Sequence, residues 1–427
     1  MYFYFGRLPE SLLILVFTAS TAWAPLSRAD SRAPLTIAEA EDIAVADEPG
    51  QVALLAREAA LEDAAVAAGQ LPDPTLRVGL ANFPISGGGF STEGMTQAQL
   101  GLRQEFPRRR SRELRTKRLQ AMASEFGNDA EARAREVVAA TRRAWLEVYY
   151  WQRAQQIVAE TRPFFADLVE VTRSMYAVGR KNQYDVLRAE LELSRLDDRL
   201  LESGRAHAQS QARLSEWLGT DAYRPAAMKL PAWNRLPSRA DLEQTLDEHP
   251  SLRAAAAGIA ARQSDVDLAN ESYKPGWALD LGYGYREGFL ASGEPRSDFV
   301  SLSVTVDLPF FGNNRQDRRL AAALSERRAS VHSKHALQAR LGSQLREAHA
   351  LWSDLTRRLA LYEARILAQS QEQAQAALLA YQSDTGDFAA VMRAYVDDLN
   401  TRLEHIRLQV DRAQSYAVIA SLGGLPR

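Results

Sequence analysis

The amino-acid sequence repeats its landmarks at a spacing of about 200 residues, and this repeat restricts the possible folds more than any other feature. Three landmarks occur twice in the same order. They are a pair of prolines (Pro49 and Pro74, then Pro250 and Pro275), a Val-Leu-Arg-Ala or Val-Met-Arg-Ala segment (186–189, then 391–394) and a Leu-Gly pair (218–219, then 422–423). Such ordered agreement indicates two copies of one structural unit. We therefore predict two repeats, 36–219 and 238–424, joined by a linker at 220–237.

The N-terminus has the features of an export signal. Arg7 precedes a short apolar run at residues 12–19, and Ala22-Trp23-Ala24 is a small-x-small cleavage site. These features predict a signal peptide over residues 1–24, with residue 29 as an alternative end. The apolar run is shorter than the roughly 20 residues that a membrane-spanning helix needs. We expect the mature protein to be periplasmic or secreted, or to enter a membrane as a β-barrel.

Two pairs of segments alternate between apolar and polar residues, which is typical of strands with one face in an apolar environment. From Val300 to Leu308 every second residue is apolar, and 277–285 has the same pattern. The first repeat alternates less regularly at 76–81 and 97–103. A hairpin in a soluble sheet would also alternate, but charged residues on its inner face would be costly in a small core and cost little in a water-filled lumen. The predicted lumen residues are Arg77, Gln97, Gln99, Arg103, Asp280, Ser301, Ser303, Thr305 and Asp307, and the aromatic residues Trp277, Tyr283, Tyr285 and Phe299 fit a girdle at the membrane interface.

Long helices follow the strands after Pro107 and Pro309. Apolar and small residues recur at steps of three and four from Leu193 to Trp217 and from Val396 to Ala420, which is the heptad pattern of a coiled coil. Helices of about 40 to 60 residues would reach roughly 60 to 90 Å. The polar segments 178–182 and 383–387 interrupt the pattern, so we predict that two helices reverse direction at each of them. Each repeat is thus a helix, a β-hairpin and a long α-helical hairpin.

Four membrane strands cannot close a barrel, because an open edge would leave unpaired backbone groups in lipid. The barrel must then be assembled from several chains, and three chains would supply twelve strands. The same symmetry would place the helical hairpins of three chains in a hollow cylinder.

This layout resembles the TolC family of outer-membrane efflux channels. The resemblance rests on the exported two-repeat order, on Leu308-Pro309-Phe310-Phe311-Gly312 with Arg315, and on the segment from Tyr176 to Ala189. It implies a mostly α fold with a membrane β-barrel, in which a homotrimer forms a 12-stranded barrel on a periplasmic α-helical coiled-coil tunnel. It also implies a passive outer-membrane exit duct in a tripartite efflux system, which docks on a periplasmic membrane-fusion adaptor and an inner-membrane pump. The sequence looks most similar to the heavy-metal and cation branch (Czc/Cus-like), which accompanies pumps of the resistance-nodulation-division type.

The resemblance assigns roles to the two hairpin tips. In the family the tips form the tunnel mouth and contact the adaptor, which implies this role for Gly179, Arg180, Lys181, Asn182, Thr385 and Gly386. Asp185 occupies the place of a gate carboxylate, whereas Ala390 stands at the equivalent place in the second repeat. Asp384 and Asp387 would add negative charge to the gate by another route. Three Asp185 carboxylates on one axis would attract cations.

Other functions find little support. The chain has 52 Lys and Arg against 54 Asp and Glu, and the basic run from Arg103 to Arg118 lacks interleaved aromatic residues, so we do not expect a nucleic-acid partner. That run fits the inner-leaflet headgroups of the outer-membrane lipid or the tunnel wall, or else a solvated helix face. With no Cys the chain has no disulfide, thiolate metal site or lipid-modified cysteine.

Catalytic, metal-binding and cofactor-binding residues are not predicted, and we do not expect an enzyme. His332 and His335 are three residues apart, but no third ligand completes a metal site, and His207 lies within a heptad stripe. Two alternatives stay open, an outer-membrane channel of type I protein secretion and a soluble periplasmic coiled-coil scaffold. Within the efflux interpretation the substrate is a metal cation, a drug, a solvent or another small molecule.

Overall fold

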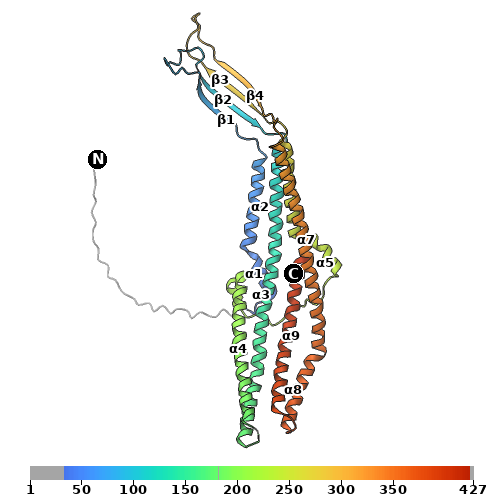
Figure 1. The fold of residues 1–427 in the computed structure, drawn as a ribbon. Helices are drawn as coiled ribbons and strands as arrows, with labels where there is room; N and C mark the ends of the chain where they lie inside the picture. Colours follow the sequence, from blue (N-terminus) through green and yellow to red (C-terminus); the bar gives the residue numbers. More distant parts are fainter. Residues whose placement is uncertain (1–32, 181, 424–427) are drawn as a thin grey trace, which may run out of the picture.

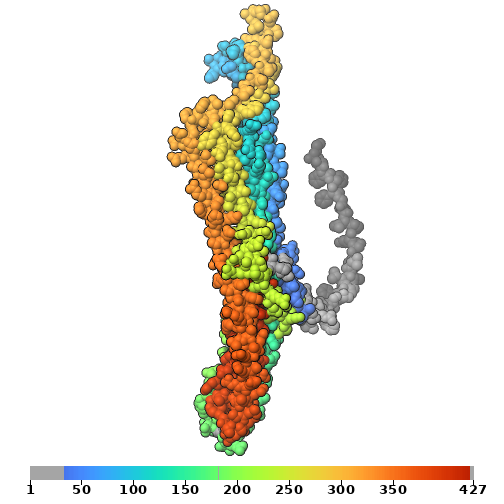
Figure 2. Space-filling model, turned by 90° about the vertical axis from the view of Figure 1, so that its right-hand side faces the viewer, coloured from blue at the N-terminus to red at the C-terminus, as the bar shows by residue number. Residues whose placement is uncertain are grey.

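A computed structural model describes residues 33–180 and 182–423. The predicted signal peptide and Lys181 lie outside the described residues. The molecule is a long rod with a sheet at one end and two helical hairpin tips at the other (Figure 1). A view turned by 90° shows how narrow the rod is, with the C-terminal helices forming its surface near the tips (Figure 2). None of the helices in the described part of the chain is both long and apolar enough to cross a membrane.

The elements follow one order in each half of the chain. The first half contains α1 (Ile37–Ala46), α2 (Pro49–Ala68), β1 (Thr75–Ala81), β2 (Gln97–Phe106), α3 (Ser111–Ala177) and α4 (Gln183–Leu218), followed by a short 3-10 helix (Gly219–Tyr223). The second contains α5 (Arg239–Leu246), α6 (Pro250–Glu271), β3 (Trp277–Tyr285), β4 (Phe299–Val306), α7 (Gln316–Leu361), a π-helical turn (Tyr362–Ile366), α8 (Leu367–Gln382) and α9 (Phe388–Gly423). Proline occupies the first position of α2 and of α6, where a missing N–H costs nothing.

The four strands form one antiparallel sheet in the order β1-β2-β3-β4. Alternation separates the two faces as predicted, with one exception. The register pairs Phe299 with Gly284 and Tyr283 with Val300, so Phe299 lies on the polar face and not with Tyr283 in an aromatic girdle. There the guanidinium of Arg286 lies 3.8 Å from the centre of the Phe299 ring. Asp307 comes directly after the last residue of β4 rather than within it, and its N–H donates to the Gly276 carbonyl.

The helices form four columns side by side. α3 is the second column, and α2 and α4 pack on it nearer the sheet and nearer the tips, respectively. α6 and α9 form the third column, which separates α3 from α7. At 67 residues α3 is longer than the predicted 40 to 60 and spans about 100 Å. A π-helical turn, which the heptad pattern does not predict, separates α7 from α8.

The predicted heptad stripes are buried where α4 and α9 pack against their neighbours. Leu196 and Leu214 of α4 and Leu399, Val410 and Ala417 of α9 are each 4% exposed or less. Most of these residues belong to one apolar cluster that extends along α3, α4 and α9. Because burial of each such side chain contributes about 1.5 to 3 kcal/mol, this cluster dominates the stability of the helical columns.

A buried ion pair fixes α1 against the middle of α3. Nε of Arg142 lies 2.7 Å from Oε1 of Glu41, and Nη2 lies 3.0 Å from Oε2. Both side chains are almost completely buried, at 4% and 5% exposed. The guanidinium of Arg142 also stacks on the ring of Trp233, at 5.0 Å from its centre, so the pair joins α1, α3 and the segment that connects the two halves of the chain.

His249 joins the end of α9 to the start of α6. It is the N-cap of α6, and its Nδ1 accepts a hydrogen bond from the Ser251 N–H at 3.2 Å. The ring also donates to the backbone carbonyl of Ser421 in the last turn of α9, so a neutral imidazole satisfies both helix ends. Burial, with a smaller effect of Arg135, lowers the pKa of His249 below its ordinary value, while the Ser421 hydrogen bond opposes this.

Removal of one partner of the buried ion pair should destabilise the protein strongly. We expect Glu41→Ala to lower the free energy of unfolding by about 3 to 5 kcal/mol, because Arg142 would stay buried without a counter-charge. Urea denaturation of the purified protein in detergent measures the loss. Asp197→Ala, which breaks the more exposed Arg162–Asp197 pair, is the matched control and should cost less than about 1 kcal/mol. Equal effects of the two variants would contradict this account.

The joint at His249 should weaken in acid. Because the fold lowers the pKa of His249, its contribution to stability is fully present above the unfolded-state value of about 6.5 and is lost as the pH falls through the folded-state value. We expect the melting temperature of the wild type to fall between pH 7 and pH 5 more than that of His249→Asn, which keeps a capping side chain. His207→Gln is the control, because burial lowers the pKa of His207 as well. Parallel pH curves for wild type and His249→Asn would refute the assignment.

Candidate functional site

Two helical hairpin tips lie next to each other at the end of the molecule opposite the sheet (Figure 1). In the tip between α3 and α4, Gly179 has a φ of +73°, a left-handed conformation that glycine adopts without strain. Its N–H donates to the Tyr176 carbonyl, and the Arg180 N–H donates to the Met175 carbonyl, both at 2.9 Å. Asn182 is the N-cap residue of α4. These bonds satisfy carbonyls at the end of α3 and make a tight reversal of the chain.

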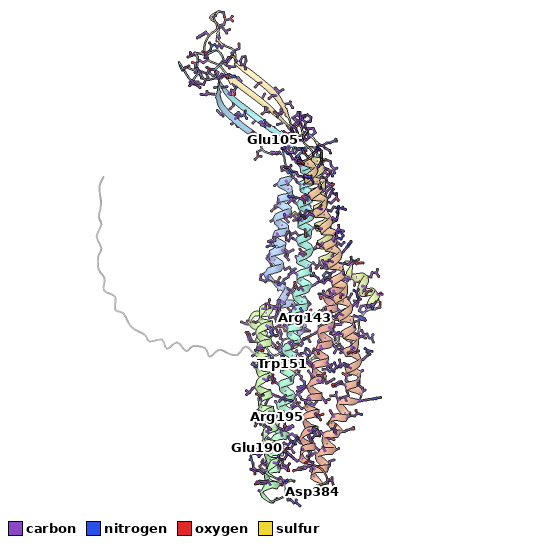
Figure 3. All side chains as sticks on the ribbon, in the orientation of Figure 1. Glu105, Arg143, Trp151, Glu190, Arg195 and Asp384 are labelled. Atoms are coloured by element: carbon purple, nitrogen blue, oxygen red, sulfur yellow. The ribbon has the colours of Figure 1, made fainter. Side chains whose placement is uncertain are left out.

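The tip between α8 and α9 requires glycine for a different reason. The N–H groups of Thr385 and Gly386 both donate to the Ala380 carbonyl at 2.9 Å. A Cβ atom on Gly386 would lie 2.9 Å from the Ala380 backbone and side chain, which is closer than real Cβ contacts. Asp384 has a φ of +60°, and its side chain lies at the far end of the molecule (Figure 3).

All three predicted gate carboxylates lie near these tips. Asp185 lies in the first turn of α4, and its N–H donates to the Asn182 carbonyl at 3.1 Å. Asp387 directly precedes α9, and its carbonyl accepts from the Ala390 N–H at 3.1 Å. Negative charge is favourable at a helix N-terminus, so Asp185 and Asp387 suit their positions on structural grounds alone.

The tips differ in the surface they expose. Around the α3–α4 tip the side chains of Tyr176, Val178 and Tyr184 are 46%, 70% and 65% exposed. In the α8–α9 tip the aromatic residues Tyr381 and Phe388 are 3% and 1% exposed instead. The α3–α4 tip therefore presents apolar surface beside Arg180, whereas the other tip presents polar and acidic side chains.

Contacts between the hairpins, which sequence reasoning missed, hold the tips together. The rings of Phe164 and Tyr395 stack with their centres 3.8 Å apart. The Tyr381 hydroxyl lies 3.6 Å from Sδ of Met175. Arg402 forms an ion pair with Glu160 at 3.0 Å. The partners in these pairs are more than 200 residues apart, so no local pattern could have predicted them.

At the other end, the sheet carries different chemistry on its two faces. The apolar face is unprotected, with Val78, Leu302 and Val304 at 74%, 69% and 59% exposed. A hollow over the opposite face is lined by eight of the nine predicted lumen residues, namely Arg77, Gln97, Gln99, Arg103, Asp280, Ser301, Ser303 and Thr305. Asp307 lies beside Gly276 at the start of the helical part. Glu105 marks the end of the sheet nearest the helices (Figure 3).

The basic run of the sequence mostly makes contacts within the chain. Arg108 and Arg112 donate to the carbonyls of Lys274 and Gly69, at 2.9 and 3.1 Å. Arg118 pairs with Asp265 at 3.2 Å. Hydrogen bonds from Lys117 and then Arg110 lower the pKa of Glu113 to about 2. The run therefore ties the strand ends and α2 to the start of α3.

Among the described residues, no histidine belongs to a group of three or more possible metal ligands. His332 and His335 are exposed on α7 with ring centres 6.4 Å apart, and no third ligand accompanies them in the described part of the chain. His207 is half-buried in the heptad stripe as predicted, and its Nε2 has no hydrogen-bond partner. The side chain is thus part of the packing of α4.

A side chain on Gly386 should disrupt the α8–α9 tip. Gly386→Ala should force the turn away from Ala380 and cost about 1 to 3 kcal/mol. Limited proteolysis at the tip and thermal melting would measure the change. Gly179→Ala is the control, since nothing lies within 4 Å of its Cβ position and only the cost of the positive φ remains. Wild-type protease resistance of Gly386→Ala would contradict the predicted clash.

Two comparisons of the sequence with known proteins match part of the chain. The model of the family described as outer membrane efflux protein matches residues 242–425. Among curated proteins, Protein CyaE of Bordetella pertussis is 31% identical over 264 residues, which are 58% of this chain and 54% of CyaE. The chain thus spans about half the length of this relative.

Solved structures share the fold over nearly the whole chain. A membrane protein from Pseudomonas aeruginosa superposes with a TM-score of 0.78 at 17% identity, covering 91% of this chain and 92% of that one. The outer membrane protein VceC from Vibrio cholerae superposes with a TM-score of 0.74 at 18% identity, covering 91% of this chain and 96% of VceC. At these identities the likeness concerns the fold.

Proposed function

We propose that this chain is a member of the outer membrane efflux protein (TolC) family and forms the outer-membrane exit duct of a tripartite efflux system. The observation that carries the proposal is the four-stranded sheet, which has an exposed apolar face, a polar opposite face and an unprotected outer edge on each side. Such a sheet suits a barrel in which lipid covers the apolar side chains and water fills the lumen. A soluble scaffold would leave these apolar side chains in water, which disfavours that alternative.

The barrel would be a homotrimer. β1 and β4 each pair on one side only within the described residues. In a bilayer, each unpaired backbone group would cost several kcal/mol, so β1 of one copy would pair with β4 of the next. Three copies close twelve strands, and three sets of four helical columns extend the lumen as a tunnel into the periplasm. The two repeats, 36–219 and 238–424, would then be equivalent units of one pseudo-sixfold wall, with 220–237 as their link.

The tips would be the contact site for a periplasmic adaptor, which links the duct to an inner-membrane pump. Exposed Tyr176, Val178 and Tyr184 form an apolar patch beside Arg180 that suits a helical hairpin partner. The duct itself would be passive, with energy supplied by the pump. A resistance-nodulation-division pump and the heavy-metal branch are the specific partner and subfamily that we propose.

Cell fractionation tests the duct directly. The chain expressed with its N-terminal segment should appear in the outer-membrane fraction as a detergent-extracted trimer that dissociates on heating. A buffer-soluble monomer in the periplasm would refute the proposal and favour the scaffold.

Asp185 should form a cation-sensitive constriction at the tunnel mouth. In planar bilayers the wild type should be blocked by divalent cations, and Asp185→Ala should lose the block, because three carboxylates on one axis attract cations. Asp198→Ala, an exposed acidic residue farther along α4, is the matched control and should retain it. Unchanged block in Asp185→Ala would exclude this gate.

A further inference from the structure

The polar face of the sheet is built from rows that cross all four strands. In one row the register places Arg77 opposite Gly101, Gly101 opposite Gly282, and Gly282 opposite Ser301. All four side-chain positions of this row therefore lie on the polar face, because strand residues in register share a face. Arg77 is the one charged residue of the row.

The next row towards the helices carries balanced charge. It contains Arg103 opposite Asp280, with the guanidinium 3.4 Å from each carboxylate oxygen. Glu105 lies 3.6 Å from Nε of Arg103, and the Thr305 hydroxyl donates to Asp280 at 3.3 Å. Arg103 thus has one carboxylate beside it in its own row, Asp280, and a second in the next row towards the helices, Glu105.

Towards the outer loops, Arg286 is also engaged. Its guanidinium donates to the carbonyls of Ser297 and Gly94, and its N–H donates to the Asp298 carboxylate. Gln97 and Gln99, which lie between this level and Arg77, are neutral. Of the two levels next to Arg77, the outer one contains no carboxylate, and the carboxylate of the inner one, Asp280, is engaged by Arg103.

Arg77 itself is exposed and makes no ion pair with any other described residue. The other residues of its row have small side chains or none, since two are glycines and the third is Ser301. A Cβ on Gly101 would have no atom closer than 3.8 Å. Nothing in the row shields the guanidinium from the water above the sheet. An exposed guanidinium without a paired carboxylate gives this level of the sheet a positive potential, which acts on ions within about a Debye length.

We propose that Arg77 is a specificity-determining residue that makes the barrel lumen attract anionic solutes. The inference rests on the proposed function, since three copies would place three Arg77 side chains at one level of a 12-stranded barrel. Rings of Arg or Lys favour anions in pores because their field raises the local anion concentration. A planar, always protonated guanidinium binds carboxylate and phosphate groups particularly well. The lumen would thus oppose in sign the acidic tunnel mouth at the tips.

Reversal potentials in planar bilayers test the role of Arg77. With the purified protein under a KCl gradient, Arg77→Gln should raise the cation-to-anion permeability ratio by about two- to tenfold, and Arg77→Glu should raise it further. Arg77→Lys should retain the wild-type ratio. The double variant Arg103→Gln/Asp280→Asn is the matched control, because it removes one arginine together with its partner and should leave the ratio unchanged. If Arg77→Gln does not assemble, the comparison of Arg77→Lys with Arg77→Glu gives the same answer.

The outcomes separate the two proposals. Conducting channels whose ratio is the same in wild type, Arg77→Gln and Arg77→Glu would overturn the role of Arg77 and leave the duct intact. A change in the permeability ratio of the double variant as large as that in Arg77→Gln would also overturn it, because the effect would then not be specific to Arg77. Absence of conductance from the correctly folded wild type would overturn the duct and the inference together.

Discussion

The arrangement of the rest of this molecule depends on the open edges of its four-stranded sheet. In lipid, a sheet with one exposed apolar face and two half-paired edge strands would satisfy its backbone hydrogen bonds if copies of the chain closed it, as we propose. The internal repeat already brings two β-hairpins into one sheet, since β2 pairs with β3 across the two halves of the chain. In the proposed barrel, further copies would extend this same pairing, and the helices below would follow the symmetry of the barrel.

The helical columns connect the sheet to the hairpin tips over the length of the rod. α3 runs without a break from the base of the sheet to the tip, so the positions of the two ends are mechanically linked. The third column is discontinuous instead, and His249 bridges its two helices. The buried pair of Glu41 and Arg142 clamps α1 near the middle. Long continuous helices and locally capped joints together connect the sheet to the tips.

Much of this architecture follows from periodicity. Alternation from Val300 to Leu308 identifies β4 and its two faces, and heptad steps from Val396 to Ala420 identify the buried stripe of α9, because both patterns depend only on backbone geometry. Glycine and polar residues at 178–182 and 383–387 mark the tips, since few other residues tolerate such turns. The π turn at 362–366 escaped prediction, because a single inserted residue hardly alters a pattern of apolar side chains.

The sequence by itself thus determined the helices and strands, the repeat and which face of each strand is apolar, since these depend on patterns of residues close together in the sequence. Register across strands depends on residues up to about 190 positions apart, so only the folded chain could show which polar residues of different strands lie opposite one another. The same holds for the pairing of Arg103 with Asp280, which leaves Arg77 alone in its row. Which charges compensate each other is a property of three-dimensional neighbours, and the chemistry of the polar face of the sheet depends on that property.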